Sequence, residues 1–292
     1  MTFNEGMQID TSTTSSSGGG RGMAIGGGVG GLLILVVALL FGVDPSTVAP
    51  TQTQGQGQDV PGFDVTQCKT GADANKILGC RIIATGNSVD AVWSQPELLG
   101  DRYTRPRTQF YTGQVSTACG GATSDVGPFY CPGDQIAYFD LDFFDVLLKQ
   151  LGSSTGPLAQ EYVVAHEFGH HVQNLLGDIG KAQQGAKGAT GNGVRTELQA
   201  DCYAGVWANY ATKIKQQNGT PYLDPFTDKD IQDVMSATQS VGDDWIQKRT
   251  TGRVDPYTFT HGTSEQRQHW FTEGYQSGDY NHCDTYDAAD LN

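Results

Sequence analysis

The stretch His166-Glu167-Phe168-Gly169-His170-His171-Val172-Gln173 lies within a helix-favouring run from Pro157 to Leu176. Residues four apart share one face of an α-helix, so the imidazoles of His166 and His170 can converge on a single metal ion. Catalytic zinc keeps one coordination position open for water, and Glu167 would stand beside that position. The stretch therefore predicts a zinc site with Glu167 as its general base.

A second helix-favouring run, Val194 to Gln217, supplies the remaining donors. Catalytic zinc usually takes three protein ligands, and we expect Glu197 to be the third. Asp201 shares the face of Glu197 and is placed to accept the other N–H of a ligating histidine, which fixes its tautomer. A third histidine in a His-x-x-Gly-x-x-His pattern is excluded, because Gln173 and Leu176 occupy the required positions.

Other polar residues are weaker candidates. The histidine pair could be structural and the acidic pair could lie on a solvated helix face, but a chance motif would not explain both helices together. His171 points to another face and is expected to be a structural residue at the helix surface. His261 could hydrogen-bond the oxyanion of a transition state, although an ordinary loop histidine is the alternative, and Tyr130 and Tyr138 are comparable candidates.

Several motifs occur in one order between Cys119 and Cys283. They are Gly127-Pro128-Phe129-Tyr130-Cys131-Pro132, the block from His166 to Gln173, Glu197-Leu198-Gln199-Ala200-Asp201-Cys202-Tyr203-Ala204-Gly205-Val206-Trp207, Ser264-Glu265-Gln266-Arg267 and Trp270-Phe271. In this combination the chain resembles the bacterial putative neutral zinc metallopeptidase family. The resemblance implies peptide hydrolysis with Zn²⁺ as cofactor. It also suggests Ile136–Asp140 as an edge strand for a bound peptide, with an internal strand as the alternative.

The fold expected for residues 65–292 is α+β, a zincin-like domain with a small sheet over the metal-binding helix pair. Further helices are expected over Ala72–Thr85, Ser88–Trp93 and Asp228–Lys248, and another from Thr263 with Gln266 completing a capping box. Strands are expected over Thr108–Ser116 and Gln135–Leu141.

The amino-terminal part is expected to lie outside this domain. Residues 1–22 are rich in Ser, Thr and Gly, which predicts a disordered segment. The run 23–43 has no charged residue and as a helix would span about 30 Å, which predicts an uncleaved transmembrane signal anchor, with a signal peptide as the alternative. Residues 44–64 are expected to form a flexible linker. Arg21 places the amino terminus in the cytoplasm and the domain outside it, at the cell membrane.

The six cysteines all follow this run, which suits an oxidising compartment. Cys68 with Cys80 and Cys119 with Cys131 would close short loops and leave Cys202 for Cys283, although fifteen connectivities and free thiols stay open. The net charge of −14 makes nucleic acid and anionic lipid poor partners. The sequence thus predicts a membrane-anchored zinc peptidase with a peptide or protein substrate; the alternative is a membrane-tethered zinc protein that binds peptides or partners without cleaving them.

Overall fold

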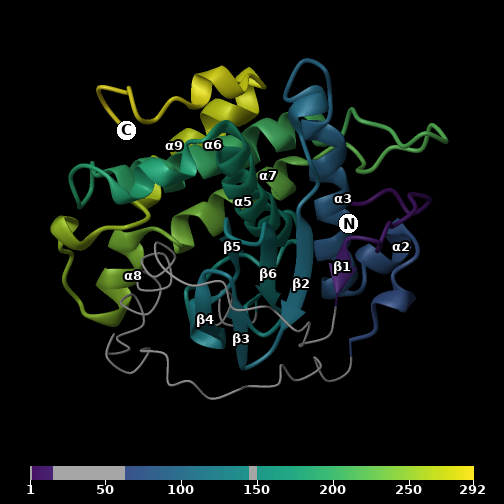
Figure 1. Cartoon of the computed structure of the whole chain (residues 1–292), viewed down its shortest axis with the longest axis horizontal. Helices are drawn as coiled ribbons and strands as arrows, with labels where there is room; N and C mark the ends of the chain where they lie inside the picture. The colour runs from purple at the N-terminus through teal and green to yellow at the C-terminus, as the bar shows by residue number, and fades with distance from the viewer. Residues whose placement is uncertain (1, 16–62, 145–149) are drawn as a thin grey trace.

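A computed structural model describes residues 2–15, 63–144 and 150–292 (Figure 1). The run 23–43, and all but the last two residues of the predicted linker, lie outside the described residues. Within the described ranges, no helix is both long enough and apolar enough to cross a membrane.

Two long helices form the centre of the molecule. Helix α5 spans Pro157–Leu176, as predicted, because proline suits the first helical position and Gly177 ends the helix in the left-handed conformation with φ 85°. Helix α6 spans Asn192–Ala211 and lies against α5. The buried apolar face of α5, which includes Phe168 and Val172, packs into the main core.

The other helices surround this pair. They are α2 (Gly71–Ala74), α3 (Leu78–Trp93), α7 (Asp228–Ser240), α8 (Asp243–Thr250) and α9 (Ser264–Ser277). The predicted capping box of α9 is confirmed, with Thr263 and Gln266 bonded reciprocally. The single helix predicted over Asp228–Lys248 is wrong. The first helix ends at Ser240, and the backbone of Gly242 is extended before a second helix starts at Asp243. The Asp243 carboxylate accepts hydrogen bonds from the backbone N–H groups of residues 260–262.

A four-stranded sheet has the order β1-β2-β6-β5, from Thr14–Ser15, Arg107–Tyr111, Ile136–Asp140 and Phe129–Cys131. Within this sheet the β5–β6 pair is antiparallel, and the β1–β2 and β2–β6 pairs are parallel. A separate hairpin joins β3 (Gln114–Thr117) to β4 (Gly120–Thr123). The expectation that Ile136–Asp140 is an edge strand is wrong, because this strand lies between β2 and β5, and β5 is the edge beside α5.

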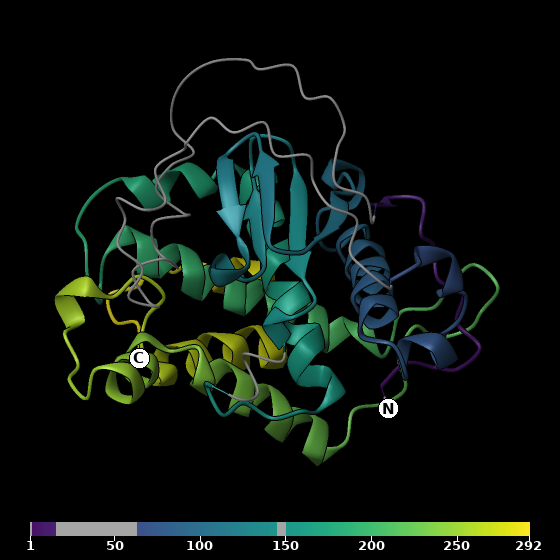
Figure 2. The same cartoon turned by 90° about the horizontal axis from the view of Figure 1, so that it is seen from below.

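The sheet lies on one side of α5, and α7, α8 and α9 lie on the other (Figure 2). This arrangement agrees with the α+β class and with a small sheet beside the helix pair. All three predicted disulfides, Cys68–Cys80, Cys119–Cys131 and Cys202–Cys283, are present.

The prediction that residues 1–22 are disordered is wrong for residues 2–15. Phe3 and Met7 are buried in the main core, and Thr14 and Ser15 form strand β1, parallel to β2. Composition alone favoured disorder. The burial of the Phe3 and Met7 side chains against the domain, however, offsets part of the entropy cost of ordering the segment.

Candidate metal centre

The two central helices approach closely at the predicted site. A Cβ atom added at Gly169 would lie 2.9 Å from the backbone oxygen of Ala200, so glycine is needed at this point of contact. The close approach brings one face of α6 against the histidine face of α5. Glu197 from α6 therefore reaches His166 and His170 from α5.

Three side chains that could each offer a metal-ligand atom converge where α5 meets α6. The Nε2 atom of His166 lies 3.1 Å from Oε2 of Glu197, and the Nε2 atom of His170 lies 3.6 Å from Oε1 of the same carboxylate. One ligand atom from each of the three residues lies within 4.8 Å of the other two, and all three side chains are buried. The structure thus places together the three residues proposed from sequence as metal ligands.

Asp201 holds the first histidine. Its Oδ1 accepts a hydrogen bond of 2.8 Å from Nδ1 of His166, so Nε2 of that ring faces the site. Arg267 on α9 donates two hydrogen bonds of 2.8 and 2.9 Å to the same carboxylate, and the Tyr162 hydroxyl donates a third. Asp201 therefore orients His166, as expected, and its charge is balanced by a buried guanidinium.

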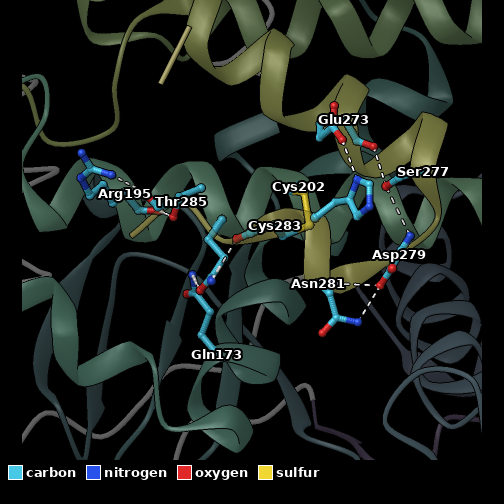
Figure 3. The surroundings of a disulfide bond; sticks show 11 residues. Gln173, Arg195, Cys202, Glu273, Ser277, Asp279, Asn281, Cys283 and Thr285 are labelled. Carbon is cyan, nitrogen blue, oxygen red and sulfur yellow. Dashed lines mark hydrogen bonds and ion pairs between the residues drawn. A yellow bond between two sulfur atoms is a disulfide. The ribbon is translucent and has the colours of Figure 1, made fainter. Parts of the chain in front are cut away.

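Glutamine side chains hold the second histidine. Nδ1 of His170 donates to Oε1 of Gln173 at 2.8 Å, and Nε2 of Gln173 donates to the Thr196 carbonyl and to Oε1 of Gln199. Gln199 in turn donates to the carbonyl of Cys283, which the disulfide links to α6 (Figure 3). The imidazole of His170 is thereby tied to the carboxy-terminal segment.

Arg267 and Gln173 were missed as site residues. Arg267 precedes Trp270 by three positions and Phe271 by four, so it shares the buried stripe of its helix, and a buried arginine requires an anionic partner. That spacing was a usable signal. Nothing in the sequence indicated a partner for Gln173.

Burial and charge set the protonation of the centre. Burial alone would lower the pKa of His166, but the carboxylates of Asp201 and Glu197 outweigh it and raise that pKa. Burial would raise the pKa of Glu197, yet His170, His261 and His166 lower it. The pKa of Asp201 is also lowered, by Arg267 and His166 against the effect of burial. The site therefore holds anionic carboxylates that attract a cation.

Glu167 lies on α5 directly after His166. Its side chain is buried, 7% exposed, and burial raises its pKa, while the neighbouring histidines act in the opposite sense. A glutamate whose pKa is raised in this way accepts a proton more readily than an ordinary carboxylate does.

His261 lies close enough to the centre to interact electrostatically with Glu197. Its Nδ1 atom is 3.4 Å from Oδ1 of Asp243, whose other oxygen accepts backbone N–H groups from residues 260–262. Burial would lower the pKa of His261, but Glu197 and Asp243 raise it. Asp243 was not expected from the sequence to support this residue.

The remaining candidates have structural partners. His171 is fully buried rather than at the helix surface, and it bonds the Tyr130 hydroxyl and the Thr104 carbonyl. Tyr130 also accepts a bond from Asn174. The hydroxyl of Tyr138 donates to Asp134. These contacts give the three residues packing roles.

The donor set fits Zn²⁺. Two imidazoles and one carboxylate form a three-ligand set found in catalytic zinc sites, and a hydrogen-bond acceptor holds Nδ1 of each imidazole. Both Nε2 atoms are thereby directed to the shared carboxylate, where a cation would replace the proton between His166 and Glu197.

A His-Glu-x-x-His helix with a glutamate from a following helix matches the ligand arrangement of zincin-type zinc sites. The chain belongs to the putative neutral zinc metallopeptidase family, whose model matches residues 5–286. It is 65% identical to the uncharacterized protein Rv2575 of Mycobacterium tuberculosis, with both chains fully covered. It is 38% identical to the uncharacterized protein YpfJ of Escherichia coli K12, over 87% of this chain and 85% of that protein. No solved structure matches.

Proposed function

We propose that this protein hydrolyses peptide bonds with zinc held by His166, His170 and Glu197. The observation that supports the proposal is the convergence of these three buried donors, one ligand atom of each within 4.8 Å of the others, beside a buried glutamate. A closed structural zinc site would want a fourth protein ligand and would give Glu167 no purpose.

When bound, zinc lowers the pKa of a coordinated water and polarises a carbonyl group. Glu167 accepts the proton of the attacking water and later delivers it to the leaving nitrogen. His261, held by Asp243, supplies a donor for the negative charge that develops on the carbonyl oxygen. The β5 edge beside α5 offers main-chain groups along which an extended substrate can lie.

We further propose that the domain works outside the cytoplasm, attached to a membrane through the run 23–43. All six cysteines are paired in disulfides, which persist in oxidising compartments. The membrane attachment is supported only by the length and charge-free composition of that run.

The test is a conservative change of the proposed base. Glu167→Gln leaves all three ligands in place, so we expect zinc content to be unchanged while turnover of a peptide library falls by roughly 10²- to 10⁴-fold. The exposed Glu265→Gln is the matched control and should retain activity. A Glu167→Gln protein that cleaves at the wild-type rate would refute the assignment.

The second candidate function is a tethered zinc protein that binds peptides without cleaving them. It is favoured if the zinc-loaded wild type turns over no peptide in the library. Replacement of His166, His170 or Glu197 by alanine should then abolish zinc content and peptide binding together.

A further inference from the structure

Residues 2–10 lie on the domain as a segment with a turn at residues 4–7, and side-chain amides hold its backbone on both sides of that turn. The amide of Asn75 bonds both the N–H and the carbonyl of Phe3, at 3.2 and 2.8 Å. Asn87 does the same for Asp10, at 2.8 and 3.0 Å, and Gln216 for Gln8, at 2.9 and 2.7 Å. Asn75, Asn87 and Gln216 thus hydrogen-bond both backbone groups of one residue each, as a neighbouring β-strand does.

Backbone contacts strengthen the same interaction. The amides of Asn4 and Ile9 donate to the carbonyls of Tyr222 and Lys69. A Cβ atom added at Gly71 would lie 1.9 Å from the backbone oxygen of Asn4, so only glycine admits the segment at this point.

The side chains of the segment are also recognised. Phe3 is 1% exposed and Met7 is fully buried, whereas Glu5 between them is exposed. Asp10 forms a 2.8 Å ion pair with Arg105, which also binds Asp90. The domain therefore contacts both the backbone of this segment and three of its side chains, two apolar and one acidic.

The segment reaches the helix that carries the metal motif. The hydroxyl of Thr2 donates to the carboxyl group of Glu161, which is completely buried in the first turns of α5. The other oxygen of that carboxyl group has no hydrogen-bond partner among the described residues. Burial raises the pKa of Glu161 to about 7.

We propose that this surface of the domain is a binding site for a peptide segment, and that its occupant is residues 2–10 of the same chain. The consequence concerns topology. Residues 2–15 and residues 63–292 must lie on the same side of any membrane, because a single crossing between them would prevent every contact described above. This proposal conflicts with the predicted cytoplasmic amino terminus. It is compatible with the membrane attachment proposed above only if both ends of the run 23–43 lie on the same side of the membrane as the domain.

Photo-crosslinking of the full-length chain in intact cells tests it. A benzophenone amino acid at position 3 should give a product within one chain, joined to a peptide containing Leu223, the partner of Phe3 in a β-bridge. The same probe at the exposed position 5 should give little of this product. Gly71→Ala should abolish the position-3 product, whereas Gly6→Ala should keep it, because an added Cβ atom there meets nothing closer than 3.4 Å.

Hydrogen exchange of the unaltered full-length protein in detergent provides a second measurement. The amides of Asn4 and Ile9 should be protected to the same degree as those of β2. Unprotected amides would overturn the binding site itself. Protection without the crosslink in cells would overturn the shared side of the membrane, and a crosslink between two copies would overturn the choice of occupant.

Discussion

The ion pair behind His166 offers a test of how the metal centre is supported. Asp201 is fully buried and Arg267 is 3% exposed, and two hydrogen bonds of 2.8 and 2.9 Å join them. Asp201→Asn leaves a buried guanidinium without its anion, and Arg267→Met leaves a buried carboxylate without its cation. The double replacement removes both charges and keeps a similar volume.

The expected magnitudes follow from the burial. Removal of one partner of a buried pair destabilises a protein by about 3–5 kcal/mol, because the remaining charge is uncompensated. Arg267→Met should lie at the lower end, since His166 can still donate to the carboxylate. The double variant should lose only about 1–2 kcal/mol for its hydrogen bonds. The interaction free energy of the cycle should therefore be at least about 4 kcal/mol.

Urea unfolding in excess chelator, with the disulfides intact, measures these free energies without the stabilisation that bound zinc would add. Zinc affinity, measured separately by chelator competition, should fall by about 10- to 100-fold for Asp201→Asn and less for Arg267→Met. Single costs that add to within about 0.5 kcal/mol would show that the two residues do not act as a pair.

Two further predictions concern other parts of α5. Because burial raises the pKa of Glu161 from 4.5 to about 7, the folded state holds this proton more tightly than the unfolded state, and the unfolding free energy should fall by about 3 kcal/mol as the pH rises through that window. Glu161→Gln should remove this dependence in pH-resolved urea melts and the exposed Glu5→Gln should retain it; equal slopes would contradict the assignment. Gln173→Leu should weaken zinc binding by about 10- to 100-fold in chelator competition, because His170 loses the acceptor at its Nδ1 atom. Asn174→Leu on the same helix should not, and equal losses would indicate a general effect on α5.

Local patterns in the sequence predicted those features that depend on neighbouring residues. The bounds of α5 follow from a proline at its first position and a glycine at its end, and the start of α9 follows from Thr263 and Gln266. The three disulfides followed from short loops and elimination. In each case the deciding groups lie close in sequence or leave few alternatives.

The errors arose where distant residues decide the structure. The break before Asp243 depends on the amides of residues 260–262, which donate to its carboxylate from 17 to 19 positions away in the sequence. Strand β5 is too short for alternation to show, so its edge position appears only in the assembled sheet. Residues 2–15 look unstructured by composition, yet Phe3 and Met7 enter a core formed by the rest of the chain.

The two histidines of the centre are oriented by separate sets of contacts. His166 depends on Asp201 and, through it, on Arg267 of α9. His170 depends on Gln173 and, through Gln199, on the carbonyl of Cys283. A change in one set should therefore leave the other imidazole in place, and the effects of the two sets on zinc affinity should be close to additive. The helix pair supplies both the ligands and the side chains that orient them, and the segments that follow α6 hold those orienting side chains in place.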